Sequence, residues 1–393
     1  MLTQPEYRAT RCTRYRYRYS ECSRCAEACP HEAVELSDEG IRISASACRN
    51  CALCAAACPT EALLADNLPR IEVLKRTAKL PEVTFACAPS ELNGDEIVPC
   101  LGGLDAAMLA YLTSRGVAVT LAGTQHCAEC SHGVRGEARL GLHLEAVEAL
   151  RGIVGSQKWA EISVPDEGET EPGKAGHDPS RRHLFRRFVG RGADQLTRPI
   201  SATEVQPVPL KAIRFAAPFS TAGRELLQIL FEAAPQDHVP LPAYPALYAA
   251  KVGIQPGCTA CEACARACPT GAMQIRESGT AWELGFQFSR CVGCGVCVEV
   301  CQPHVLHFQD EMENLAKAPE PVILHALGKQ RCTRCDRFFI SPAPGGNLSD
   351  LRRGRCGFFV HFWLKESLML TVPMNNFQIC RLVPRPQAEA QHR

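Results

Sequence analysis

The sequence has almost no net charge and no long apolar run, and each absence excludes a class of protein. Its 393 residues carry a formal net charge of +1 at pH 7. A chain so balanced has no overall attraction for nucleic acid or for an anionic membrane. No stretch of about 18 apolar residues occurs, so we expect no membrane span.

Motifs that hold organic cofactors or nucleophiles are also absent. There is no GxGxxG after an expected strand, no P-loop and no GxSxG turn. Asp105 and Glu145 fall on expected helix surfaces, where carboxylates are solvated. The N-terminus, MLTQPEYRATRC, has no apolar core or small-residue cleavage site, so we expect no secretory signal. We therefore expect a protein that is not itself an enzyme.

Cysteine, by contrast, is abundant, with 24 residues. In a small secreted chain this number favours disulfides, but disulfide frameworks rarely show tight x2/x2/x3 registers followed by proline. Three thiols on one tight loop and a remote fourth are instead the ligand pattern of an iron–sulfur cube. We interpret the cysteines as reduced cluster ligands, which places the protein in the cytoplasm.

The C-terminal half carries two consecutive runs of this kind. They read Cys258-x2-Cys261-x2-Cys264-x3-Cys268-Pro269 and Cys291-x2-Cys294-x2-Cys297-x3-Cys301. This doubled spacing resembles that of bacterial two-cluster ferredoxins, in which the fourth cysteine of each run ligates the other [4Fe–4S] cube. The pattern predicts two ligand sets: Cys258, Cys261, Cys264 with Cys301, and Cys291, Cys294, Cys297 with Cys268.

The N-terminal block repeats this spacing with one defect. A complete run, Cys48-x2-Cys51-x2-Cys54-x3-Cys58-Pro59, follows a shorter one, Cys22-x2-Cys25-x3-Cys29-Pro30, in which Tyr19 replaces the first cysteine. We predict one cube on Cys48, Cys51, Cys54 and Cys29, and another on Cys22, Cys25, Cys58 and a further ligand, for four cubes in all.

Cys12 is our candidate for that further ligand, because the spacer 13–21 is long enough to loop back. An open [3Fe–4S] cluster or a labile iron is the alternative. The spacer alternates arginine and tyrosine from Arg14 to Tyr19, which in an extended strand would put tyrosines on one side and arginines on the other. The tyrosines would then exclude water and the arginines raise the reduction potential. An RNA-binding role is disfavoured because the basic patch is short.

Each block also has signals for a small domain. Between the N-terminal runs, Ala33–Leu36, a turn at 38–40 and Ile41–Ile43 predict a hairpin, and Ala272–Ile275 and Trp282–Phe286 predict another in the second block. We expect ferredoxin-like units over 10–66 and 246–312.

The centre, 80–165, predicts a small parallel α/β domain. We expect strands at 82–87, 96–100 and 117–121, and helices at 104–115 and 137–151. Four cysteines follow the carboxyl ends of these strands, the edge where α/β sheets bind ligands: Cys87, Cys100, Cys127 and Cys130. Four thiolates suit zinc, [2Fe–2S] or [4Fe–4S] by count. His126 and His132 are candidate hydrogen-bond donors beside this site.

The stretch VPCLGGLDAAMLAYLTSRGVAVTLAGTQHCAECSHG, with Cys87 upstream, resembles the delta subunit of methyl-viologen-reducing hydrogenase over roughly 60 residues. That subunit is associated with a [2Fe–2S] cluster and passes electrons to heterodisulfide reductase. The resemblance implies [2Fe–2S] at the central site, with zinc as the alternative.

The remaining segments are less informative. Residues 166–245 read as a linker with a basic amphipathic helix at 181–190 and a second amphipathic helix at 222–233. In the tail, 313–393, Cys332 and Cys335 resemble half of a metal-binding zinc ribbon whose second pair is missing. From about residue 346 regular patterning is lost, which fits either a change of reading frame or an ordinary divergent tail.

The order of these parts resembles iron–sulfur proteins associated with molybdenum or tungsten formate dehydrogenases. That resemblance implies an electron carrier for a separate oxidoreductase, such as a formate dehydrogenase. Two alternatives stay open: a non-catalytic subunit of a hydrogenase-type complex, and an assembly factor that delivers iron, sulfur or electrons to a metalloenzyme. A carrier predicts stable, fully ligated clusters, whereas an assembly factor predicts at least one labile cluster.

Overall fold

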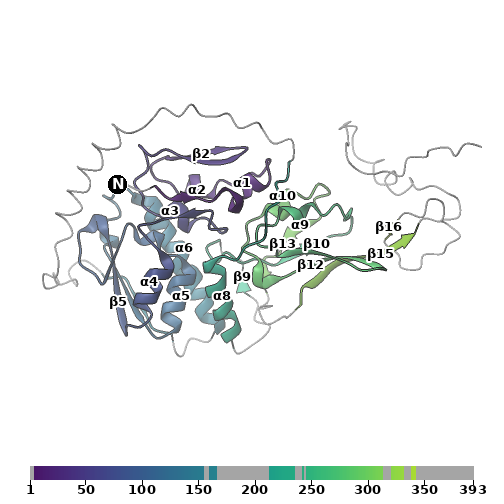
Figure 1. The fold of residues 1–393 in the computed structure, drawn as a ribbon. Coiled ribbons are helices and arrows are strands. Elements are labelled where there is room, and N and C mark those ends of the chain that lie inside the picture. Colours follow the sequence, from purple (N-terminus) through teal and green to yellow (C-terminus); the bar gives the residue numbers. More distant parts are fainter. Residues whose placement is uncertain are drawn as a thin grey trace, which may run out of the picture. The chain divides into compact units, whose positions relative to one another are not determined.

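A computed structural model describes residues 4–154, 159–165, 212–234, 241–242, 245–312, 320–331 and 338–341 (Figure 1). The chain divides into two compact units, one of residues 1–275 with 284–325 and the other of residues 276–283 with 326–393. The first unit contains all the cysteines that the structure describes. The helix expected at 181–190 in the linker lies outside the described residues.

The N-terminal cysteine block folds around two antiparallel strand pairs. Its elements are β1 (Glu6–Tyr7), α1 (Thr13–Arg16), α2 (Arg24–Glu27), β2 (Val34–Ser37), β3 (Gly40–Ile43), α3 (Leu53–Ala56) and β4 (Leu63–Leu64). β1 pairs with β4, and β2 pairs with β3 across a tight turn. The predicted hairpin is confirmed.

The second cysteine block repeats this plan. Its elements are β10 (Val252–Ile254), α9 (Ala263–Ala267), β11 (Met273–Glu277), β12 (Ala281–Phe286), α10 (Val296–Glu299) and β13 (Leu306–Phe308). The outer strands β10 and β13 pair with each other, and β11 and β12 are neighbours in one sheet. In both blocks, therefore, the two cluster loops each lead into a short helix between the same pairs of strands.

A parallel sheet occupies the centre of the sequence, as predicted. Its strands are β5 (Glu82–Cys87), β6 (Glu96–Val98), β7 (Ala118–Ala122) and β8 (Ile162–Ser163), in the order β6-β5-β7-β8. All three pairings are parallel. Two helices connect these strands, α5 (Ala106–Ser114) and α6 (Gly133–Val154), and α4 (Arg70–Thr77) precedes them. Gly116, at φ +84°, ends the α5 turn in a conformation that favours glycine.

Asp105 differs from its expected role as a solvated surface carboxylate. It is only 2% exposed and caps the N-terminus of α5, where its Oδ1 accepts from the backbone N–H of Met108 at 2.9 Å. Arg70 donates to its other oxygen. Sequence periodicity placed Asp105 at a helix but did not reveal Arg70, whose positive charge offsets the cost of burying the carboxylate. Glu145 is exposed, as predicted.

Part of the expected linker is a packed element of the fold. The amphipathic helix at 222–233 is confirmed as α8 (Ala222–Ala233) and lies beside α5 and α6 (Figure 1). Leu227, Leu230 and Phe231 form its buried face. The carboxylate of Glu61 accepts from the backbone N–H groups of Ala222 and Gly223, at 3.1 and 2.9 Å, and so satisfies the free donors at the start of the helix.

Two further strand pairs lie in the C-terminal part of the described structure. They are β9 (Leu241–Pro242), which pairs with β14 (Glu311–Met312), and β15 (Val322–Arg331), which pairs with β16 (Phe338–Ser341). In the sheet order, β15 follows β12. Cys332 and Cys335 lie outside the described residues, as does the tail from residue 342, so the half-ribbon stays a prediction. No helix in the described part of the chain is long and apolar enough to cross a membrane.

Candidate iron–sulfur sites

The first two cysteine sites lie in the second block, where the thiols come together in the crossed pattern expected from the sequence. Burial, with the charges of Cys261, Cys258 and Cys301, raises the pKa of Cys264 to about 12. Burial also raises the pKa of Cys297 well above its ordinary value, and the charges of its neighbours Cys294, Cys291 and Cys268 add to the shift. Each loop of three thiols thus lies with the fourth cysteine of the other run.

The complete N-terminal run lies with Cys29 in the same way. Burial, followed by the charges of Cys29 and Cys48, raises the pKa of Cys51 to about 11. The thiol of Cys54 is buried beside Cys51, Cys25, Cys29 and Cys48, and its pKa is raised as well. The predicted set of Cys48, Cys51, Cys54 and Cys29 is therefore one cluster of thiols.

Cys12 lies near the thiols of the defective run. Burial and then the charges of Cys58, Cys12 and Cys22 raise the pKa of Cys25 to about 12. Cys12 is itself buried, and burial followed in part by the charge of Cys58 raises its pKa. A fourth thiol thus lies near the others of the run that has Tyr19 in place of its first cysteine.

The spacer between Cys12 and Cys22 does not adopt the extended form that we expected. Residues 13–16 form α1, so arginines and tyrosines do not separate onto two sides. Arg16 is fully buried, and Tyr17 is 7% exposed whereas Tyr19 is 64% exposed. Because residues 13–16 are helical, the chain turns and Cys12 lies near Cys25. An extended strand would carry Cys12 away from Cys25. The extended segment predicted from the alternation of arginine and tyrosine was therefore wrong.

The cluster loops repeat an unusual backbone conformation. In three of the four runs, the residues before and after the second cysteine have positive φ, and these pairs are Asn50 and Ala52, Ala260 and Glu262, and Gly293 and Gly295. Non-glycine residues rarely adopt this left-handed form, so its repetition indicates that the loops are held in one geometry. The run without a first cysteine, Cys22 to Cys25, lacks such positions.

Backbone N–H groups point at several sulfur atoms. Ala33 donates to the Sγ of Cys29 at 3.3 Å, and Ala62 donates to the Sγ of Cys58 at 3.3 Å. The left-handed residues Glu32 and Glu61 immediately precede these donors and turn the chain toward the sulfur. Donors of this kind stabilise charged thiolates, as they do in iron–sulfur proteins.

Two buried arginines provide a further test of whether anionic clusters fit. Arg224 is 3% exposed, its Nε and Nη1 have no hydrogen-bond partner within the described structure, and burial lowers its pKa to about 10 against the charge of Cys291. Arg16 is fully buried against carbonyl oxygens, and the charges of Cys268 and Cys294 act on it. A buried cation is costly without a counter-charge. A cluster of iron, sulfide and four thiolates is an anion that would supply it, so these residues fit the group.

The four central cysteines line one cavity of about 190 Å³ at the carboxyl edge of the parallel sheet. Burial, then the charges of Cys51, Cys87 and Cys127, raises the pKa of Cys100 to about 12. Burial and the charges of Cys87, Glu137 and Cys130 raise that of Cys127 to about 11. The prediction that Cys87, Cys100, Cys127 and Cys130 converge therefore agrees with the geometry.

Two glycines leave room for this convergence. A Cβ on Gly136 would lie 2.9 Å from the Sγ of Cys100, and one on Gly123 would lie 2.8 Å from the Sγ of Cys87. A larger residue at position 136 would press on the Cys100 thiol, and one at position 123 would press on Ser90 as well as on the Cys87 thiol. The two glycines thus leave room for the sulfur atoms of Cys87 and Cys100 beside the cavity.

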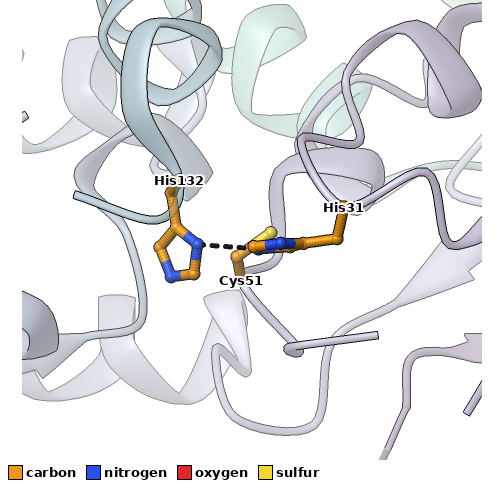
Figure 2. A group of neighbouring side chains, drawn as sticks. All are labelled: His31, Cys51 and His132. Carbon is orange, nitrogen blue, oxygen red and sulfur yellow. Dashed lines mark hydrogen bonds between the residues drawn. The ribbon is translucent and has the colours of Figure 1, made fainter. Parts of the chain in front are cut away.

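A pair of histidines joins the central site to the N-terminal block. His31 Nε2 and His132 Nδ1 are 3.0 Å apart, and both lie within 4.8 Å of the Cys51 sulfur (Figure 2). Burial and the charge of His31 lower the pKa of His132 to about 4. Its backbone N–H, rather than its imidazole, donates to the Sγ of Cys130 at 3.4 Å. A donor role of the His132 side chain at the site stays a prediction. His126 is exposed.

Sequence reasoning missed His31, whose only signal is its position two residues after Cys29. It also missed the arginines that cross between the two cysteine blocks. Arg24 donates to the carbonyl oxygens of Cys294 and Gly293, at 3.3 and 3.1 Å. Arg16 donates to that of Cys268 at 3.5 Å. Nothing local in the sequence marks such contacts, because the partners are more than 250 residues apart.

Comparison with known families agrees with this geometry. Residues 20–62 and residues 257–306 each match a model described as a 4Fe–4S dicluster domain. The chain is therefore a multi-cluster iron–sulfur protein. It contains two ferredoxin-like 4Fe–4S domains, whose matched residues include every cysteine of the two blocks except Cys12. No curated protein and no solved structure was found to match the chain.

Proposed function

We propose that this protein is an electron carrier that relays electrons to or from a separate oxidoreductase, and that this partner is a formate dehydrogenase. Iron–sulfur clusters exchange single electrons, and four thiolate ligands per cube leave no position for a substrate. The observation that carries the proposal is that a fourth thiol lies near the other three in each of the four predicted ligand sets, with Cys12 near Cys25.

The ligand sets are four cysteines each. They are Cys258, Cys261, Cys264 and Cys301; Cys291, Cys294, Cys297 and Cys268; Cys48, Cys51, Cys54 and Cys29; and Cys12, Cys22, Cys25 and Cys58. The central site, on Cys87, Cys100, Cys127 and Cys130, holds a [2Fe–2S] cluster in this proposal, with zinc as the alternative.

The fourth thiol supports a carrier over an assembly factor. An assembly factor needs a cluster that leaves readily, which an open coordination position would favour. Cys12 is buried and lies beside Cys25 and Cys58, so it is placed to close the only run that lacks a cysteine. Formate dehydrogenase as the partner is supported by the resemblance of the domain order, and a hydrogenase-type complex by the resemblance of the centre.

The purified, anaerobically reconstituted chain tests the carrier proposal. It should be reduced reversibly by dithionite yet show no turnover of formate, hydrogen or nicotinamide by itself. Transfer to a formate dehydrogenase should slow as salt rises, because exposed charges are screened beyond about 8–10 Å near physiological ionic strength. Formate turnover by the isolated polypeptide would refute the carrier role. Normal formate oxidation in a deletion strain would refute only the partner.

A further inference from the structure

The cysteine sites within each ferredoxin-like domain lie next to each other. In the N-terminal domain, the charge of Cys25 acts on Cys54, although the two belong to different ligand sets. In the second domain, the charge of Cys264 acts on Cys297 in the same way. The helices behind these cysteines are also in contact, α2 with α3 and α9 with α10. Each domain thus pairs its own two sites.

The two domains meet through the loop that carries Cys25. Arg24, the residue before Cys25, uses both terminal nitrogens to donate to the carbonyl oxygens of Gly293 and Cys294. Arg16 reaches the carbonyl oxygen of Cys268 from the segment after Cys12. Both contacts join the Cys12 site to the Cys268 site. Neither involves the other two sites of these domains.

The central site contacts the N-terminal domain at the loop that carries Cys51. Cys51, Leu53 and Cys100 form one buried cluster, in which Leu53 is fully buried. The 3-10 helix Leu101–Gly103 packs against α3, and a Cβ on Gly103 would lie 3.3 Å from that of Ala52. The glycine therefore permits the close approach of the two loops.

The histidine pair strengthens this second contact. His31 follows Cys29 and His132 follows Cys130, and the two imidazoles meet beside the sulfur of Cys51 (Figure 2). Arg135, in the first turn of α6, donates to the carbonyl oxygen of Cys29. The central site is thus connected to the Cys29 site.

We propose that the five cysteine sites form a single unbranched series. It runs from the central site to the Cys29 site, the Cys12 site, the Cys268 site and finally the Cys258 site, with Arg24 bridging the two ferredoxin-like domains. The series rests on the proposed carrier function and adds its route: electrons enter at one end and leave at the other.

Exposed residues lie beside the ligands of both end sites, as they also do beside the inner sites at Glu21 and Arg49. Beside the central ligands, His126, Ala128 and Glu129 are exposed. Beside the Cys258 ligands, Gly257 and Thr259 are exposed.

Redox titration of the full-length, reconstituted chain tests the bridge, with the spectrum of each reduced cluster followed by EPR. A positive charge stabilises the more negative reduced state, so loss of an arginine lowers the midpoint potential of a cluster near it. Arg24→Ala should lower two midpoints, one in each ferredoxin-like domain. Arg24→Lys, which keeps the charge, should restore both toward the wild-type values.

Arg14→Ala is the matched control. Arg14 also donates to a cluster-loop carbonyl, that of Cys22 at 3.2 Å, but its other partner is Ser37 in the same domain. It should lower a midpoint in the N-terminal domain only. If Arg24→Ala shifted midpoints in one domain alone, Arg24 would not be the bridge.

Loss of an end site tests the order independently of Arg24. Neighbouring paramagnetic clusters broaden each other's EPR signals, so a lost cluster changes only the signals of its neighbours. Cys130→Ser should alter the Cys29-site signal and leave the C-terminal domain unchanged, and Cys258→Ser should alter only the Cys268-site signal. If Cys130→Ser changed the C-terminal signals instead, the series would be wrong. Failure of the wild-type clusters to be reduced reversibly would instead refute the carrier function itself.

Discussion

The guanidinium of Arg70 joins Asp105 to Glu61, two buried carboxylates from different parts of the fold. Its Nη1 donates to Asp105, and its Nη2 lies 3.2 Å from Glu61 Oε1. Burial alone would lower the pKa of Arg70, but the charges of Asp105 and Glu61 outweigh burial and raise it. Because Asp105 caps α5 and Glu61 caps α8, one arginine holds both helix starts beside the cysteine loop that ends at Cys58.

Replacing Arg70 should therefore destabilise the fold strongly. Arg70→Met leaves the buried carboxylate of Asp105 without its ion pair and leaves Glu61 with only the longer pair to Arg11, at 3.8 Å. We expect a loss of about 3–5 kcal/mol in the free energy of unfolding. Arg76→Met is the control, since Arg76 is 55% exposed in its pair with Glu96 and should cost at most about 1 kcal/mol. Anaerobic urea titration followed by circular dichroism measures both. Equal losses would contradict the role of Arg70.

Two glycines of α6, Gly136 and Gly141, allow the effect of a substitution on the central site to be told apart from its effect on helix stability. In Gly136→Ala, the new Cβ would lie 2.9 Å from the Cys100 sulfur, so we expect loss of the central metal with the other clusters retained. Gly141 has nothing within 4 Å of the same position. Gly141→Ala should keep the metal and stabilise the chain by about 0.5–1 kcal/mol. Metal analysis of both variants decides, and full central loading in Gly136→Ala would count against the site.

Cys12 should be required for one cluster only. In Cys12→Ala, we expect one [4Fe–4S] signal to convert to a [3Fe–4S] signal or to disappear, while the other clusters keep their spectra. EPR of the oxidised and dithionite-reduced variant provides the measurement. An unchanged spectrum would mean that Tyr19 or an external ligand completes the site.

His143 should make stability sensitive to acid. It is fully buried, and burial lowers its pKa to about 4 from an ordinary value of 6.5. In the unfolded chain, His143 takes up a proton below about pH 6.5, whereas in the folded chain it does so only near pH 4. The contribution of neutral, buried His143 to the free energy of unfolding is therefore fully present above pH 6.5 and is lost as the pH falls toward 4. His143→Gln should lose less stability between pH 7 and pH 5 than the wild type, as measured by urea titration at both values.

The exposed His126 supplies the comparison for this effect. His126→Gln should follow the wild-type pH dependence. If the His126 and His143 variants behaved alike, burial of His143 would not be the cause of the acid sensitivity.

The sequence allowed prediction of the features that depend on spacing. The cysteine runs predicted the cluster loops, and the alternation around residues 38–40 predicted a hairpin that the structure confirms. The positions of Cys87 and Cys127 after apolar runs placed them at one edge of a parallel sheet, because carboxyl ends of parallel strands meet there. These signals are local or follow from general topology.

Features that depend on distant partners could not be predicted in this way. Arg16 was expected on the arginine side of an extended segment, but its guanidinium donates to the carbonyl oxygens of Ala216, Ala217 and Cys268, far along the chain. The helix at 222–233 was expected in a linker, yet Glu61 fixes its first turn. In each case a buried charge is tolerated only because of a partner that no local pattern reveals.

The iron and acid-labile sulfide content of the anaerobically reconstituted full-length chain, combined with EPR during a reductive titration, tests the central claim most directly. The account predicts about 16 irons in four cubes, with about two more at the central site, and reversible one-electron reduction of the cubes. Zinc in place of iron in the two ferredoxin-like domains, or irreversible loss of clusters on reduction, would contradict it.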